Sequence, residues 1–201
     1  MPARKLSPPV KGTIPVAFVI SEDVTLIDFA GPWEVFQDVM VGDQMPFQLF
    51  TVSNKIETVI GSAGIKLVPD YTFATVPECK VVVIPAQKGS DEMREWLRKI
   101  AGTAEVTMSV CAGAFQLAKA GLLAGKSATT HHDFLDKLEK DFPDIKVKRG
   151  VRFVEDDRIS TAGGLTSGID LALRVVERYF GRAVAEKTAI YMEYEGKGWL
   201  V

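Results

Sequence analysis

The sequence predicts an α/β fold in which a mostly parallel β-sheet is covered on both faces by helices. The run 14–20 is apolar throughout, and so is 81–85 within the predicted strand 80–85, which is typical of strands buried on both sides. Segments with apolar residues at helical spacing, such as 90–100 and 169–180, follow these and other strand-like runs. Because buried strands alternate with helices, we expect one sheet between two helical layers.

Length and composition are those of one globular domain. The chain has 201 residues, of which 47% are hydrophobic and 25% charged, enough to build a substantial core. We expect a flexible N-terminal tail over 1–12 and a single domain over 13–201. The tail carries Arg4, Lys5 and several prolines but no apolar core, so it does not resemble a secretory signal.

Charge and cysteine content narrow the class of partner and the compartment. A net charge of −2 does not favour electrostatic binding to nucleic acid or to an anionic membrane. No apolar run is long enough to span a bilayer. The two cysteines are far apart and form no disulfide framework, which favours a reducing compartment and hence the cytoplasm. We therefore expect a small-molecule partner, without nucleic acid or membrane.

The first half of the chain reads as strands interrupted by two helices. Pro32 fits the first turn of a helix over 33–40, and Ser90 is a suitable N-cap for an amphipathic helix over 90–100. Gly61 and Gly64 favour a turn between two short strands. The predicted strands are 14–20, 47–52, 58–60, 65–68 and 80–85.

The second half continues the alternation. A buried strand over 106–110 leads into a helix over 112–123, and Asp133 begins an acidic first turn of a helix over 133–141. The adjacent acids Asp156 and Asp157 predict a turn between two strands. The remaining predicted elements are strands at 127–130, 145–147, 151–154 and 159–161, and helices at 169–180 and 183–194.

Cys111 is the most informative residue, because it lies where a strand turns into a helix. At such a turn the sulfur is held near unpaired N–H groups, which favour negative charge. We therefore expect the pKa of the thiol to be lowered and the thiolate to be available as a nucleophile. Ala112 and Gly113 are small enough for a tight turn. Packing is the alternative role of a free cysteine, and we assign it to Cys79.

Several polar or reactive groups follow predicted strands. Asp28 comes after the first strand, Ala86 and Gln87 follow the strand at 80–85, and Cys111 follows the next. Ligands of parallel sheets bind beyond the carboxyl ends of the strands, so we expect these residues to converge there. A plain helix-capping role for Asp28 is the alternative.

Three segments together resemble the ThiJ/PfpI superfamily, over nearly the whole chain from about Val16 to about Tyr194. They are 26–35, with the sequence LIDFAGPWEV, the elbow SVCAGAF at 109–115 with AGLLAGKSATTH at 120–131, and TAGGLTSGID at 161–170. The resemblance is to the isocyanide hydratase branch and to sensor-like domains of certain AraC-type regulators. It implies a flavodoxin-like fold with a nucleophile elbow.

The resemblance implies that Cys111 is the nucleophile and Asp28 its acid/base partner. The expected substrate is a small electrophile, an isocyanide, which becomes an N-substituted formamide without a cofactor. Main-chain N–H groups of Ala112 and of Ala86 and Gln87 would stabilise developing charge. Homodimers are common among such proteins, so we expect one here. The alternative is a redox-sensing or ligand-binding protein in which Cys111 is oxidised rather than turned over.

The sequence departs from the hydratase pattern in two places. Ala112 stands where these enzymes have threonine, and Ala86 and Gln87 stand where they have two glycines. The Gln87 amide is expected to replace the lost hydroxyl or to alter substrate choice. Ala112 also stands where PfpI-type peptidases have histidine, so the resemblance does not extend to peptidase activity.

The remaining candidate pocket residues are His131, Gly163, Gly164 and Thr166. His131 follows a strand and lines the pocket or is structural, while the glycine pair makes a tight turn. Thr166 either donates hydrogen bonds near the site or caps the next helix. We expect no metal, because the adjacent His131 and His132 on a strand would point away from each other and match no ligand spacing.

Overall fold

A central seven-stranded sheet organises the computed structural model, which describes residues 4–200. Its strand order is β10-β11-β7-β6-β1-β2-β5, and all neighbours are parallel except the antiparallel pair β10 and β11. The bounds are β1 (Ile14–Val19), β2 (Phe47–Ser53), β5 (Tyr71–Thr72), β6 (Val81–Ile84), β7 (Val106–Ser109), β10 (Phe153–Asp156) and β11 (Ile159–Ala162).

Two small sheets lie outside the central one. The strands β3 (Val59–Ile60) and β4 (Lys66–Leu67) form an antiparallel hairpin, as the glycines between them predict. The strands β8 (Ser127–Ala128) and β9 (Lys146–Val147) pair in parallel, and a helix lies between them in the sequence.

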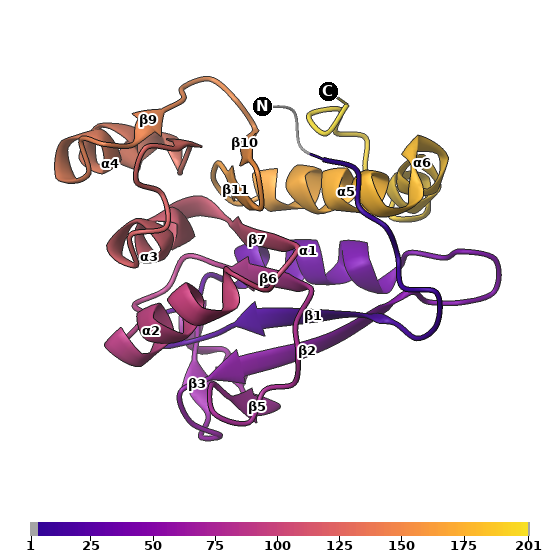
Figure 1. Ribbon diagram of the computed structural model, residues 1–201, viewed down its shortest axis with the longest axis horizontal. Coiled ribbons are helices and arrows are strands. Elements are labelled where there is room, and N and C mark those ends of the chain that lie inside the picture. Colours follow the sequence, from indigo (N-terminus) through magenta and orange to yellow (C-terminus); the bar gives the residue numbers. More distant parts are fainter. Residues whose placement is uncertain (1–3, 201) are drawn as a thin grey trace.

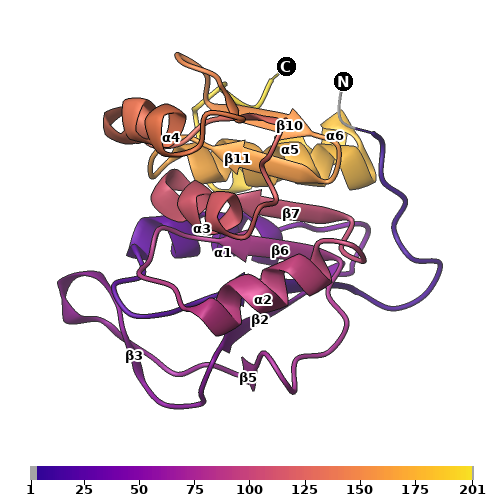
Figure 2. The same cartoon turned by 60° about the vertical axis from the view of Figure 1, so that its left-hand side comes forward.

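Helices cover both faces of the central sheet (Figures 1 and 2). One face is covered by α1 (Leu26–Gln37), α5 (Ser167–Phe180) and α6 (Arg182–Tyr191), and the other by α2 (Asp91–Ile100), α3 (Ala114–Lys119) and α4 (Leu135–Asp141). The predicted α/β fold, with a mostly parallel sheet between helical layers, is confirmed.

Alternate residues of each central strand supply the two cores. Val16 and Phe18 of β1 pack in the core beneath α1 and α5, whereas Ala17 and Val19 pack in the core beneath α2 and α3. Because successive strand side chains point to opposite faces, a strand buried on both sides must be apolar throughout. This is why the continuous apolar runs identified the central strands.

The predicted start of the helix expected over 33–40 is wrong. The observed helix α1 begins at Leu26, so Pro32 lies inside it. Proline normally disfavours a helix interior because it removes a hydrogen bond. Here α1 packs so closely on α5 that a Cβ on Gly31 would lie 2.9 Å from Cγ1 of Ile169, and a Cβ on Gly168 would lie 3.1 Å from Cγ of Pro32. Tertiary packing therefore outweighs the local preference.

The helix expected over 112–123 is also shorter than predicted. Cys111–Gly113 form a 3₁₀ turn, α3 ends at Lys119, and turns follow. The short edge strand β5 was not predicted at all. With two residues it is too short to give a periodic pattern.

The described part of the expected tail is attached to the domain at Arg178, whose Nε donates to the carbonyl oxygen of Arg4 at 3.1 Å. Leu6 is 4% exposed and its N–H donates to the carbonyl oxygen of Arg178, while residues 1–3 lie outside the described residues. Between residues 4 and 200, every helix falls short of the length and apolar character that crossing a membrane requires.

Candidate active site

Cys111 occupies a strained turn at the carboxyl end of β7. Its φ is +57°, a left-handed conformation that residues other than glycine seldom adopt. Its N–H donates to the carbonyl oxygen of Gly163 at 2.8 Å, and the N–H of Val110 donates to that of Ile84 at 3.0 Å. Strained residues held by their surroundings concentrate at functional sites. The predicted elbow is therefore present, with a 3₁₀ turn after the cysteine.

Gly113 lets this turn lie directly on the end of β6. A Cβ at this position would lie 2.1 Å from the carbonyl oxygen of Ile84 and 2.8 Å from that of Pro85. Both obstacles are backbone atoms, which cannot move aside as a flexible side chain can. Glycine at this position is thus required by close approach, as its place in the turn suggested.

Asp28 lies in the first turn of α1 and is fully buried. Its Oδ2 accepts a hydrogen bond from the N–H of Ala86 at 3.1 Å. Burial raises its pKa to about 6, although the Ala86 N–H, the Cys111 thiol and the Leu165 N–H each act to lower that pKa. Among the described residues, Oδ1 has no partner at full hydrogen-bond geometry. The carboxyl is therefore beside the thiol with one oxygen uncommitted.

The expectation of a lowered thiol pKa is wrong. Burial and the charge of Asp28 raise the pKa of Cys111 to about 11, while the N–H groups of Ala112 and Leu165 lower it only in part. The residue is 7% exposed, so little water stabilises an anion on the sulfur. Desolvation and like charge outweigh the two main-chain donors that the turn supplies.

The two groups form a pair that holds one proton at neutral pH. A pKa of about 6 leaves Asp28 ionised at pH 7, and a pKa of about 11 leaves Cys111 protonated. The proton is on the sulfur and the base is beside it. The arrangement suits transfer of that proton at the moment of attack, rather than a standing thiolate.

Leu165 is the site residue that sequence reasoning missed. Its N–H acts on both Asp28 and Cys111, and its φ is +53°, a second left-handed conformation beside the site. Nothing in a leucine side chain marks such a role. The only available signal was its position directly after Gly163 and Gly164, in a loop already expected near the site.

Ala86 and Gln87 lie beside the site, but their hydrogen-bond donors are already bonded to other groups of the protein. The Ala86 N–H is donated to Asp28, so it supports the acid rather than a developing oxyanion. The Gln87 amide donates to the carbonyl oxygens of Val19 at 2.9 Å and Pro85 at 3.2 Å. Ala112 directs its N–H toward the sulfur, and this residue lines a hollow of about 230 Å³ together with Gln87.

The other four predicted residues line a separate hollow of about 340 Å³. His131 lies against the glycine pair so closely that a Cβ on Gly164 would lie 2.2 Å from its Cδ2. Thr166 accepts a hydrogen bond from Arg152 at 3.1 Å and makes no side-chain cap for α5. Gly163 links this hollow to the elbow through its bond to Cys111, which itself lines neither hollow.

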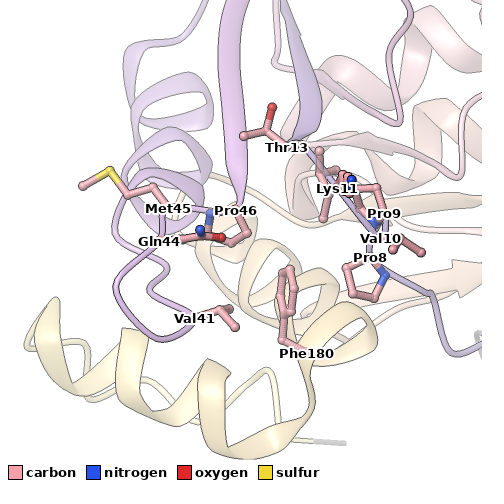
Figure 3. Close-up of a pocket in the computed structure, with 12 residues that line it drawn as sticks. Pro8, Pro9, Val10, Lys11, Thr13, Val41, Gln44, Met45, Pro46 and Phe180 are labelled. Atoms are coloured by element: carbon pink, nitrogen blue, oxygen red, sulfur yellow. The ribbon is translucent and has the colours of Figure 1, made fainter.

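A further hollow of about 570 Å³ lies at the opposite end of the sheet (Figure 3). Pro8, Val41, Pro46 and Phe180 are among its lining residues, close to where β1 and β2 begin. Cys111 follows the carboxyl end of a parallel strand, so this hollow is remote from the thiol.

The fold and the site together define the class: a flavodoxin-like α/β protein with a cysteine at an elbow and a buried carboxyl beside it. The chain belongs to the DJ-1/PfpI family, whose model matches residues 15–178.

Among its relatives is an isonitrile hydratase of Pseudomonas putida, 32% identical over an alignment of 188 residues that covers 89% of this chain and 78% of the relative. A solved ThiJ/PfpI family protein from Pseudomonas syringae superposes with a TM-score of 0.82 at 27% identity, covering 92% of this chain and 77% of the other.

Other relatives are regulators of transcription. The HTH-type regulator GbdR of Pseudomonas aeruginosa is 24% identical over 90% of this chain, and the chain spans about half of that regulator's length (50%). The exclusion of nucleic acid that the net charge suggested is therefore not confirmed.

Proposed function

We propose that this protein hydrates a small electrophile, an isocyanide, to an N-substituted formamide. The observation that carries the proposal is the buried Asp28 carboxylate beside the protonated thiol of Cys111. The 32% identity to an isonitrile hydratase supports this choice of substrate class.

In the first half of the reaction the thiol adds to the terminal carbon of R–N≡C. Asp28 accepts the thiol proton while the sulfur bonds to that carbon, and it then returns the proton to the same carbon. The product of this half is a thioimidate, R–N=CH–S–Cys111. The N–H groups of Ala112 and Leu165 stabilise the sulfur while it carries negative charge.

In the second half water hydrolyses the thioimidate. Asp28, again ionised, takes a proton from water as the water oxygen bonds to the carbon, and it passes this proton to the nitrogen. The carbon–sulfur bond then breaks as the hydroxyl oxygen becomes the carbonyl oxygen, and Asp28 transfers the hydroxyl proton to the sulfur, giving R–NH–CHO and the free thiol. A carboxyl with a pKa of about 6 suits both directions of transfer near neutral pH.

The same geometry disfavours the redox-sensing alternative. Oxidation of cysteine to sulfenic acid follows thiolate character and exposure. The Cys111 residue is 7% exposed and its pKa is about 11, so both conditions are poorly met in the resting protein. The hydratase needs only a transient anion, formed with the base already in place.

A direct assay tests the proposal. We would incubate the purified chain with an aryl isocyanide and follow the formyl proton of the product by NMR. Cys111→Ala and Asp28→Asn should each abolish turnover. Cys79→Ala, which removes the other thiol, and Glu34→Gln, which removes an exposed acid from the same helix as Asp28, are the matched controls.

If the folded wild type shows no turnover, the proposed hydratase activity is wrong. Full activity in Cys111→Ala would remove the proposed nucleophile. Rapid peroxide modification confined to Cys111, without turnover, would favour the sensor instead.

A further inference from the structure

Three consecutive side chains beside the glycine pair, His131, His132 and Asp133, lie close together. Their potential ligand atoms are all within 4.8 Å of one another. The expectation against a metal rested on two histidines alternating along a strand. Instead, β8 ends at Ala128 and a 3₁₀ helix begins at His132.

The turn brings the two rings to the same side. They stack with centroids 4.3 Å apart and 30° between their planes. The premise that adjacent histidines point away from each other is therefore wrong at this place in the chain.

The separations between donor atoms suit one transition-metal ion. Nδ1 of His131 is 3.6 Å from Oδ2 of Asp133, and Nε2 of His132 is 3.1 Å from Oδ1 of Asp133. Two ligands at about 2.0–2.1 Å from a tetrahedral Zn²⁺ ion are about 3.3 Å apart. To bind one ion, the two histidine rings must rotate out of their stacked arrangement, and Nδ1 of His131 must give up the hydrogen bond of 3.3 Å that it accepts from the Asp133 N–H.

One of the three ligands is mostly buried and the other two are exposed. His131 has a side chain 18% exposed, packed on Gly164 and in contact with the ring of Phe134 at 5.7 Å. The side chains of His132 and Asp133 are 79% and 66% exposed. Within residues 4–200, Asp133 has ion pairs only with these two histidines, so no lysine or arginine competes for its carboxylate.

We propose that His131, His132 and Asp133 bind a divalent first-row transition-metal ion of the Zn²⁺ type, with water completing its coordination. Imidazole nitrogens favour Zn²⁺, Cu²⁺ and Ni²⁺ over Mg²⁺ and Ca²⁺, which prefer sets of oxygen ligands. The site is distinct from Cys111 and uses no group of the proposed hydration reaction. Its ion would hold the His131 ring in place against Gly164.

The histidine content makes a sharp test possible, because the chain contains two histidines in all. In ¹⁵N-labelled protein without an affinity tag, an imidazole NMR spectrum reports on His131 and His132 alone. Titration with ZnCl₂ should shift both rings with the same saturation curve, and calorimetry should show one site.

Variants at the two exposed positions complete the test. His132→Gln and Asp133→Asn should each weaken Zn²⁺ binding by about tenfold or more, since each removes one of three protein ligands. Asp136→Asn, at a nearby carboxylate 92% exposed, is the matched control and should bind as the wild type does. A shift of one ring only, wild-type affinity in both variants, or no saturation by millimolar Zn²⁺ would overturn the site.

Discussion

The hydroxyl of Thr130 donates a hydrogen bond to the carbonyl oxygen of Cys111 at 2.8 Å. The same oxygen also accepts a hydrogen bond from the Ala114 N–H, and the Cys111 N–H donates to Gly163, so both main-chain polar groups of the cysteine are paired. Thr130 and Gly163 come from segments distant in the sequence. The left-handed backbone of Cys111 is thus held by tertiary structure rather than by its own preference.

Replacing Thr130 with valine should destabilise the fold and loosen the elbow. Valine keeps the shape but removes one of the two hydrogen bonds to the buried Cys111 carbonyl oxygen and leaves the one from the Ala114 N–H, so the cost should be about 1 kcal/mol. Thr130 is 2% exposed, so water cannot easily replace the hydroxyl. Urea denaturation measures the loss, with Thr130→Ser as the control that retains the donor. A valine variant as stable as the wild type would show that this bond does not hold the turn.

The alkylation rate of the Cys111 thiol should keep rising at pH values where a free cysteine is already fully ionised. In the wild type, alkylation should accelerate with rising pH up to about 11, the pKa of the buried thiol. Asp28→Asn removes the carboxylate charge that raises this pKa, so alkylation at pH 8 should become faster. The same variant should lose hydration activity, because the base is gone.

Opposite effects of one substitution on alkylation and turnover would separate thiolate formation from proton transfer. Pseudo-first-order alkylation rates across the pH range, read by mass spectrometry, provide the measurement. Glu34→Gln should leave the profile unchanged, since that acid is exposed. A wild-type profile centred near the pKa of a free cysteine would contradict the raised pKa.

Asp28 should also make the protein less stable as the pH rises. Its pKa is 3.8 when unperturbed and about 6 in the fold, so between these values the folded state binds more protons than the unfolded state. The free energy of unfolding should therefore fall as pH increases from about 4 to about 6, by at most about 3 kcal/mol from this residue. Above that range the penalty is constant.

Asp28→Asn should remove this dependence and raise stability at pH 8. Denaturation midpoints of the variant and of the wild type at pH 4 and pH 8 test the sign. If the variant and the wild type differ in midpoint by the same amount at both pH values, the fold does not raise the pKa of the Asp28 carboxyl.

The fold was predictable because it follows from patterns within short segments. The run at 14–20 is apolar throughout because Phe18 and Val19 face opposite cores, and the helix after Ser90 has its cap, with the Met93 N–H donating to the Ser90 hydroxyl at 3.1 Å. The beginning of α1 was not predictable in this way, because its passage through Pro32 depends on packing against α5.

The proximity of Asp28 and Cys111 was predictable, but the electrostatics of the site were not. The position of both residues after strands predicted that they converge, and the family resemblance implied that they act as partners. The direction of the thiol pKa depended on burial and on the distance to a charge, neither of which a local pattern contains. The roles of Leu165 and of the stacked His131 ring likewise arise from main-chain turns that sequence does not display.

Gly113→Ala should be strongly destabilising, because its Cβ would lie 2.1 Å from the backbone oxygen of Ile84. Relieving that overlap requires the elbow to move away from β6, and the cost should reach about 3 kcal/mol or more, toward the upper end of single substitutions. Gly102→Ala is the matched control, since its nearest atom would be 3.7 Å away and its backbone is not left-handed. Equal melting temperatures for the two variants would contradict the close approach.

Ala112→Thr should raise the rate of isocyanide hydration. Ala112 is the residue next to Cys111 and lines the hollow of about 230 Å³ together with Gln87 and Phe115, so a larger threonine side chain has room there. Gln87 does not supply an equivalent donor, because its amide nitrogen is bonded to the carbonyl oxygens of Val19 and Pro85. An added donor that strengthens in the transition state should increase kcat more than it changes KM. Steady-state kinetics of Ala112→Thr beside Ala112→Val, which adds similar bulk without a hydroxyl, would measure this. A valine variant that gains as much as the threonine variant would show that shape, and not the hydroxyl, limits the reaction.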